Sequence, residues 1–188
     1  MVQGSAFPDE YAKWEPLAAE IITTLDGLTP AAVCPNQDPA EQPATGGGPP
    51  VAGGWTRPMG ATAVITSEYG HISSKRSGPH QGMDFAQGRG DGAPVLAAGP
   101  GTITHAGPGA RGWAGIYVEI DHGGGLVTIY GHLSRTTATV GQQVAGGTQV
   151  GEQGNTGNSY GAHLHFQVEQ NQQHTNPRPF LAARGVTL

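Results

Sequence analysis

The stretch IYVEIDHGGGLVTIYGHL at residues 116–133 decides the fold of this chain. Apolar residues at 116, 118 and 120 alternate with other residues at 117, 119 and 121, which is the period of a strand that buries one face. The turn HGGG at 122–125 follows, and residues 126–133 return as a second strand. The stretch therefore predicts an antiparallel hairpin with one face in an apolar core.

The chain after Trp55 extends this pattern. Apolar and polar residues alternate in HLHFQVE at 163–169, and a short strand around Val144 follows the turn residue Gly141. Glycine (32 residues) and proline (15) are abundant and only 12% of residues are charged, which favours a β fold with tight turns over a helical bundle. We expect residues 55–188 to form an all-β domain of half-buried strands. Its antiparallel sheet would fold into a sandwich or half-barrel, with a groove over the polar face.

Two segments precede this domain. Residues 8–27 are predicted to form a helix, because apolar residues recur at spacings of three and four and Pro8 suits the first turn. Its apolar stripe is expected to pack on the main domain, on a partner or on an upstream domain. Residues 35–54 have almost no large apolar side chains, so they are predicted to be a flexible linker. The expected division is a helical segment over 1–34, this linker, and the domain that follows it.

Composition excludes several classes of function. A formal net charge of −5 argues against nucleic-acid binding, which needs a basic surface. No run of 18 apolar residues is present, so no membrane span is expected. The N-terminus lacks the basic and apolar regions of a signal peptide, so another route of export, delivery by a phage, or a start after such a peptide is expected. Cys34 is the single cysteine and is expected to be a free thiol.

Three segments carry residues that are suited to metal chemistry. His163 and His165 are two apart in a predicted strand, so both project from the same face. In the segment HQGMD, a glycine allows His80 and Asp84 to converge on one point. A catalytic zinc takes three nitrogen or oxygen ligands and keeps an open position, and His80, Asp84 and one histidine of the pair supply that number. His132 ends a predicted strand. Taken singly, each segment is also compatible with ordinary surface residues.

Further motifs run along the domain in a recognisable order. They are SEYG at 67–70, HQGMDF at 80–85, GAPV at 92–95, AAGPGT at 97–102, YGHLS at 130–134, GQQV at 141–144, GNTGNS at 154–159, HLHF at 163–166 and NP at 176–177. Over about residues 55–180 the chain resembles the lysostaphin and LytM-type zinc endopeptidases, metallopeptidase family twenty-three. The resemblance implies an antiparallel β domain of the duplicated hybrid motif type.

Carried over residue by residue, the resemblance implies that His80, Asp84 and His165 bind one Zn²⁺ and that His132 and His163 are catalytic. All five positions hold the residue that the family uses, unlike relatives that have lost ligands and act as activators. The implied activity is hydrolysis of peptide bonds in the stem or cross-bridge peptides of bacterial peptidoglycan, for cell-wall lysis or remodelling. Such an enzyme is expected to be extracellular or at the cell wall, secreted or delivered by a phage.

A mechanism follows as a hypothesis from these residue types. Zinc lowers the pKa of water in its open position, and one of His132 and His163 takes a proton from that water as a general base. The two histidines stabilise the oxyanion, and one of them protonates the leaving amine. The residue types leave open which histidine performs which step. Tyr69 is a candidate donor to the oxyanion, with simple packing as the alternative.

Other functions remain open from the sequence. The same fold could serve as a non-catalytic wall-binding or regulatory module, as a structural component of a phage tail or secretion apparatus, or as a metallo-hydrolase with another substrate. Loops around 71–79, 105–115 and 153–162 are expected to form the groove walls. His71 and Tyr160 depart from residues common in the family near this groove, which affects substrate preference rather than catalysis.

Overall fold

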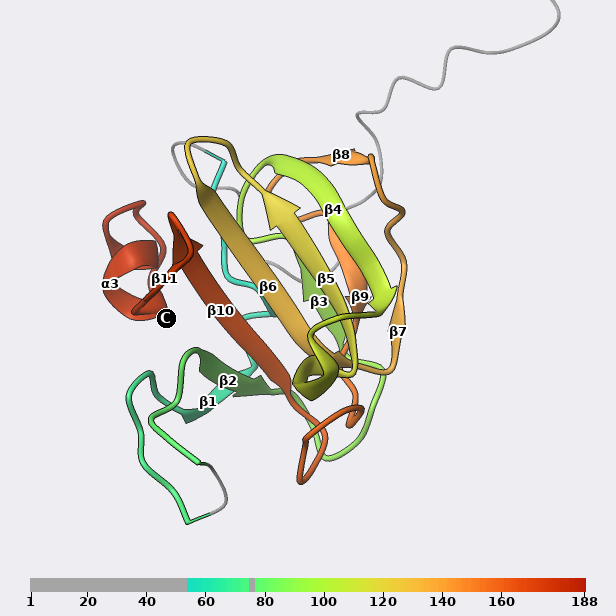
Figure 1. The fold of residues 1–188 in the computed structure, drawn as a ribbon, viewed down its shortest axis with the longest axis vertical. Coiled ribbons are helices and arrows are strands. Elements are labelled where there is room, and N and C mark those ends of the chain that lie inside the picture. The colour runs from blue at the N-terminus through green and yellow to red at the C-terminus, as the bar shows by residue number, and fades with distance from the viewer. Residues whose placement is uncertain (1–53, 75–76) are drawn as a thin grey trace, which may run out of the picture. The chain divides into compact units, whose positions relative to one another are not determined.

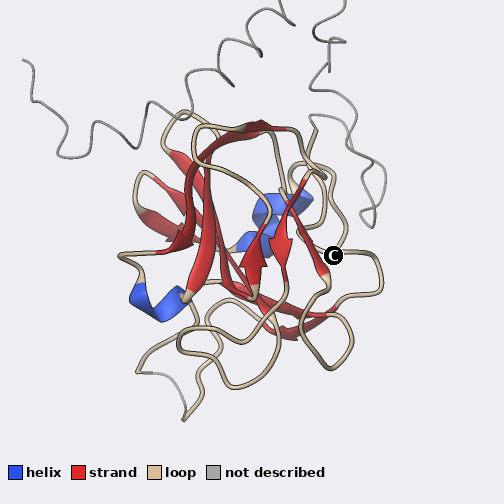
Figure 2. Ribbon diagram, turned by 90° about the vertical axis from the view of Figure 1, so that its right-hand side faces the viewer, coloured by secondary structure: helices blue, strands red, loops and turns tan. Residues whose placement is uncertain are grey.

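Two antiparallel sheets share one apolar core (Figure 1). The computed structural model describes residues 54–74 and 77–188, so the predicted helix over 8–27 and nearly all of the predicted linker lie outside the described residues. Within the described part, strands and loops dominate and helices are short, as the side view in Figure 2 shows. The prediction of an all-β sandwich is confirmed.

The larger sheet follows the order β1-β2-β10-β6-β5-β4-β8, with β11 paired to β10, and the smaller sheet follows β3-β9-β7. The strands of the larger sheet are β1 (Val64–Ser67), β2 (Met83–Ala86), β4 (Gly101–Pro108), β5 (Ile116–Asp121), β6 (Leu126–Leu133), β8 (Gln143–Val144), β10 (Leu164–Gln170) and β11 (Gln173–Thr175). Those of the smaller sheet are β3 (Pro94–Leu96), β7 (Arg135–Thr136) and β9 (Gln149–Glu152). Both sheets contribute to one buried cluster, with Val95 and Val150 from the smaller sheet and Val118, Tyr130 and Phe166 from the larger.

The hairpin predicted for residues 116–133 is present as β5 and β6. Its turn needs glycine, because Gly123, Gly124 and Gly125 have φ values of 81°, 60° and 75°. Residues with a Cβ atom rarely adopt this left-handed region, and three in succession would be strongly disfavoured. The backbone N–H of Gly123 also donates to a carboxylate oxygen of Asp121 over 2.8 Å, which closes the turn.

Strand β10 lies between β2 and β6, and this position organises the centre of the larger sheet. In the antiparallel register His165 is opposite Asp84 of β2 on one side and opposite Gly131 of β6 on the other. Because directly opposed residues have neighbouring side chains, the ladder brings Asp84 next to His165 and the end of β6 close to both. Three segments that are far apart in the sequence therefore meet at one place.

The expectation that the strands are half-buried is wrong for β10. Leu164, Phe166 and Val168 face the core, and the polar residues between them are also buried. Only 1% of Gln167 is exposed. The cause is a loop after β4, which carries the 3₁₀-helix Gly112–Ala114 and lies over the polar face. Strand alternation cannot reveal such a cover, because the residues that supply it lie more than fifty positions earlier in the chain.

The C-terminal part carries a second short helix that the sequence patterns did not indicate. This helix, α3, spans Pro177–Ala182. The side chain of Asn176 accepts a hydrogen bond from the backbone N–H of Arg178, and Pro177 occupies the first turn. Both features start a helix efficiently, because a side-chain oxygen satisfies a free N–H and proline has none to satisfy. No helix among residues 54–74 and 77–188 is both long and apolar enough to cross a bilayer.

The covering loop is held against the segment that precedes β10 by a very close backbone approach. A Cβ atom added to Gly115 would lie 2.5 Å from the backbone nitrogen of Gly157. The hydroxyl of Thr156 accepts from the N–H of Ile116 over 3.0 Å and donates to the carbonyl of Leu133 over 2.7 Å. The N–H of Asn158 donates to the carbonyl of Trp113. The loop and this segment thus support each other through backbone contacts that leave no room for a side chain.

We expect Gly115→Ala to lower the free energy of unfolding by about 2–4 kcal/mol, because φ at this position is +66° and the new methyl group would meet backbone atoms. Gly112→Ala is the matched control in the same loop, since a Cβ atom there has no neighbour within 4 Å. That control is expected to change stability by less than about 0.5 kcal/mol. Urea unfolding followed by tryptophan fluorescence measures both, and equal effects of the two substitutions would contradict the account.

Candidate metal centre

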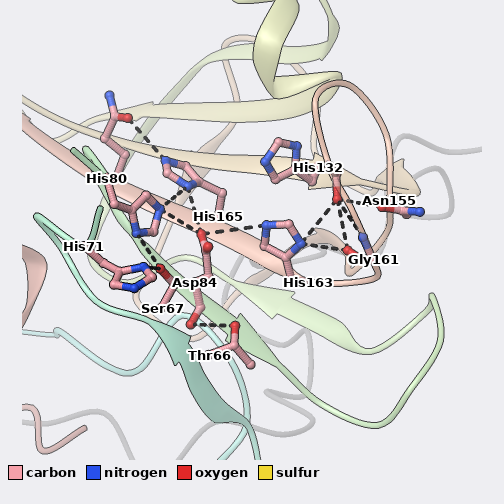
Figure 3. A network of polar contacts seen from close by, with 12 residues as sticks. Thr66, Ser67, His71, His80, Asp84, His132, Asn155, Gly161, His163 and His165 are labelled. Atoms are coloured by element: carbon pink, nitrogen blue, oxygen red, sulfur yellow. Dashed lines mark hydrogen bonds and ion pairs between the residues drawn. The ribbon is translucent and has the colours of Figure 1, made fainter. Parts of the chain in front are cut away.

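Three buried side chains converge where β2 and β10 pair (Figure 3). His80 lies just before β2, Asp84 lies within β2, and His165 lies within β10. Their exposed fractions are 3%, 4% and 6%. The structure therefore brings together the three residues that the resemblance implied as metal ligands.

The ligand atoms of these residues form a triangle. Oδ1 of Asp84 lies 3.0 Å from Nε2 of His80 and 3.0 Å from Nδ1 of His165, and the two nitrogens are 3.0 Å apart. Tetrahedral ligands at about 2.0–2.1 Å from Zn²⁺ are roughly 3.3 Å from one another, so a small outward movement fits the ion. Two imidazole nitrogens and one carboxylate oxygen are also a donor set that zinc accepts. The residues present thus fit a zinc ion.

Hydrogen bonds prepare this triangle for a cation. Nδ1 of His80 donates to the carbonyl oxygen of Glu68 over 2.9 Å, which leaves the lone pair of Nε2 facing the centre. Burial alone would raise the pKa of Asp84, but the protons and positive charge that His165 and His80 can offer it when no metal is bound outweigh burial, so the pKa lies below its usual value. Burial lowers the pKa of His165. Asp84 is therefore ionised, and His165 favours the neutral form that ligates metals.

Two further histidines stand beside the triangle. The ring centroids of His132 and His163 are 4.7 Å apart, and His132 is 5.8 Å from the ring of His165. Nε2 of His163 lies 3.7 Å from Oδ1 of Asp84. Nδ1 of His132 donates to the carbonyl of Thr156 over 2.9 Å, and Nδ1 of His163 donates to that of Gly161 over 2.7 Å. In both rings Nε2 is left with a free lone pair, which is the acceptor that a general base needs.

The backbone and the surroundings of His132 set it apart from its neighbours. Its φ is 64°, in the left-handed region that non-glycine residues rarely occupy. Strain of this kind clusters at functional sites. Burial, and then the positive charges that His163 and His165 can carry, lower the pKa of His132 to about 4. The imidazole is therefore neutral at physiological pH and able to accept a proton.

A groove of about 810 Å³ runs over the five residues. One wall contains His71, a second contains Trp113, and a third contains Asn158 to Ala162 with Tyr160 among them. All three come from the loops that the sequence indicated as walls. The exposed fraction of Tyr160 is 67% and that of Trp113 is 37%, so apolar surface is available beside the polar centre. Such a groove suits an extended peptide with both polar and apolar parts.

Tyr69 does not join this cluster. Its hydroxyl donates to the backbone carbonyl of His174 over 3.4 Å, and Tyr69 is not among the residues that line the groove. Sequence reasoning also missed two residues that do contribute. Trp113 packs edge-on against His165 with ring centroids 5.0 Å apart, and Thr156 holds His132 through its carbonyl. A lone tryptophan in a glycine-containing loop carries no pattern that would have predicted this contact.

Comparison with known proteins agrees with this geometry. A model of Peptidase family M23 matches residues 78–177, which include all five residues of the cluster. An uncharacterized metalloprotease of Haemophilus influenzae is 36% identical over 124 residues, which cover 64% of this chain and 26% of that protein. The peptidoglycan DD-endopeptidase ShyA of Vibrio cholerae is 41% identical over 100 residues, covering 52% of this chain and 22% of that protein. The chain thus spans about a quarter of the length of these curated relatives.

Solved structures give the same result for the fold. The catalytic domain of the antimicrobial peptidase lysostaphin from Staphylococcus simulans is 33% identical with a TM-score of 0.56, covering 63% of this chain and 92% of that one. A zinc-containing peptidase from Vibrio cholerae is 33% identical with a TM-score of 0.53, covering 60% of this chain and 35% of that one. The sequence match spans more than half of the chain, and the fold agrees with it. This chain belongs to peptidase family M23.

Proposed function

We propose that this chain is a zinc-dependent endopeptidase that hydrolyses peptide bonds in the stem or cross-bridge peptides of bacterial peptidoglycan. The observation that carries the proposal is the set of three ligand atoms with two histidines beside it, whose Nδ1 atoms are both bound to backbone carbonyls, all lining one groove. The substrate class is supported by relatives, since one is named a peptidoglycan DD-endopeptidase and another is lysostaphin. This substrate lies outside the cytoplasmic membrane, so we place the activity at the cell wall, reached by secretion or by phage delivery.

His80, Asp84 and His165 would hold the ion. Zinc would supply a Lewis acid that polarises a carbonyl oxygen and makes water a stronger acid. The carboxylate of Asp84 offsets part of the positive charge, and burial of all three ligands strengthens their attraction for the ion because the local dielectric is lower than that of bulk water. These residues also hold one another in place, because each ligand atom lies 3.0 Å from the other two.

His132 and His163 would move the protons. Each ring has Nδ1 committed to a backbone carbonyl, so only Nε2 is able to accept a proton from water. The deprotonated water would then attack the peptide carbonyl, and the histidine of the pair that took the proton would donate it to the oxyanion or to the leaving amine. Trp113 and the wall that contains Tyr160 would orient the peptide and exclude water around it.

The experiment that tests this function is digestion of purified peptidoglycan, with released fragments identified by mass spectrometry. We expect new amino termini at one type of peptide bond, abolished by a zinc chelator and restored by added Zn²⁺. Several wall chemistries should be tried, because the groove alone does not name the bond. Absence of release from all of them, with one zinc bound per chain, would instead favour a non-catalytic wall-binding or regulatory role.

Asp84→Asn should remove zinc binding and activity together, because it replaces the ionised ligand with a neutral amide of the same shape. We expect zinc affinity to fall by more than about 100-fold. Substitution of residues that only hydrogen-bond to metal ligands typically lowers metal affinity by about 10- to 100-fold, and loss of a ligand should exceed that. Metal content after gel filtration gives the measurement. Asp91→Asn is the control, since Asp91 is exposed and outside the groove, and it should bind zinc normally. Full zinc binding by Asp84→Asn would refute the ligand assignment.

His132→Asn should separate catalysis from metal binding. Asparagine tolerates the left-handed backbone at this position and cannot act as a general base. We expect kcat to fall by about 10²- to 10⁴-fold while zinc stays bound at its normal ratio. His105→Asn, a half-buried histidine outside the groove, should leave both quantities unchanged. Loss of zinc from His132→Asn would mean that His132 is a ligand.

A further inference from the structure

The polar face of β10 continues beyond His165 as a buried chain of contacts. His165, Gln167 and Glu169 are two apart and project from the same side of the strand. Nε2 of His165 lies 3.3 Å from Oε1 of Gln167, and Nε2 of Gln167 donates to Oε1 of Glu169 over 2.7 Å. The exposed fractions of Gln167 and Glu169 are 1% and 8%. Gln167 borders the groove next to His165, whereas Glu169 does not line it, and the proposed mechanism uses neither of them.

His165 uses its ring nitrogens in the opposite way from the other three histidines of the site. His80, His132 and His163 each donate from Nδ1 to a backbone carbonyl, which leaves Nε2 for the centre. In His165 it is Nδ1 that faces Asp84, so its proton must be on Nε2 if Nδ1 is to bind a metal. A backbone carbonyl can only accept and therefore determines the tautomer. The partner of Nε2 in His165 is an amide side chain, whose two ends are donor and acceptor.

Glu169 removes this ambiguity. Both carboxylate oxygens of Glu169 accept hydrogen bonds from Arg111, and a carboxylate oxygen in this role draws the NH₂ end of the Gln167 amide towards itself. The amide oxygen must then face His165, and an amide oxygen accepts only from a protonated Nε2. The lone pair of His165 is thereby left on Nδ1, where the metal centre is.

Arg111 in the covering loop makes both carboxylate oxygens of Glu169 hydrogen-bond acceptors. Its guanidinium donates to both carboxylate oxygens of Glu169 over 3.0 and 3.1 Å, and to Glu119 over 3.0 Å. Burial opposes the positive charge of Arg111, but the bonds to Glu169 outweigh it, so the pKa of Arg111 is raised. A two-point contact of this kind also fixes the plane of the carboxylate.

We propose that Gln167 and Glu169 are positioning residues, which together with Arg111 fix the tautomer of His165 so that Nδ1 is the metal-binding nitrogen. This inference rests on the proposed function only for the role of His165 as a ligand. It also gives a reason for the buried polar face of β10. Burying an amide and a carboxylate costs free energy unless both are fully hydrogen-bonded, so packing alone does not account for Gln167 and Glu169. Partners behind a metal-bound histidine commonly orient the ring and set its basicity.

The test compares three variants of the full chain. Gln167→Leu removes the acceptor for His165. Gln167→Glu combined with Glu169→Gln keeps composition and charge, and it retains an acceptor at 167 that the amide at 169 can pair with. Gln143→Leu makes the first change at an exposed strand position in β8 and is the control.

Zinc affinity by chelator competition is the first readout. We expect Gln167→Leu to bind zinc roughly 10- to 100-fold more weakly than the unchanged chain. The double variant and Gln143→Leu should stay within about threefold, on the same scale of effects. A role limited to filling space would predict the reverse order, because leucine fills the site and the double variant moves a charge.

Two-bond ¹H–¹⁵N spectra of the zinc-loaded proteins at neutral pH are the second readout, with His165 assigned by the loss of its signals in His165→Phe. The unchanged chain and the double variant should show the proton on Nε2, and Gln167→Leu should show a mixture of tautomers. Unchanged affinity and tautomer in Gln167→Leu would overturn the inference. If Gln167→Leu does not fold, a folded double variant with weakened zinc binding or an altered tautomer would overturn it equally. Failure of the unchanged chain to bind any zinc would count against the proposed function, whereas zinc binding with the proton of His165 on Nδ1 would count against this inference alone.

Discussion

The pairing of β10 between β2 and β6 is the constraint on which the rest of the site depends. This register places His165 opposite Asp84 and next to the end of β6, from which His132 projects. Because side chains alternate along a strand, a slip of one residue would turn His165 into the apolar core and bring Phe166 to the polar centre. Burial of Leu164, Phe166 and Val168 in the core therefore fixes the register of β10, and this register positions the polar residues between them. One face of β10 thus contributes to the stability of the core, and the opposite face carries the residues of the metal centre.

The site is assembled largely by backbone carbonyls. Three histidines donate from Nδ1 to carbonyl oxygens of Glu68, Thr156 and Gly161. Because a carbonyl oxygen only accepts hydrogen bonds, the neutral rings carry their proton on Nδ1 and their lone pair on Nε2. Two of these carbonyls belong to the segment 153–162, which also forms a groove wall. The same segment thus aims His132 and His163 and shapes the space above them. Burial then keeps His132 neutral, which is the form that accepts a proton.

The covering loop after β4 links the fold to the centre in a second way. Trp113 lies edge-on against His165, and Arg111 holds Glu169 from the same loop. The loop in turn depends on the close approach of Gly115 to Gly157, where no side chain fits. A buried cluster of one carboxylate and several imidazoles is costly in free energy unless it is paired or bound to a cation. The loop over β10 buries these groups together, so a metal ion bound among them would offset the free-energy cost of their burial.

The sequence by itself determined the hairpin at 116–133, the all-β class, and the family to which the chain belongs, because period-two alternation, glycine turns and local motifs are read along the chain. Spacing also placed His163 and His165 on one side of a strand. Tertiary structure decided how they differ: His165 pairs with β2 and joins the triangle, whereas His163 is bridged to Gly154 and stands beside it. It also decided that Tyr69 points to His174, that Trp113 and Thr156 support the site, and that both faces of β10 are buried. These outcomes depend on contacts between segments far apart in the chain, and the alternation within one strand does not predict which distant segment packs against its polar face.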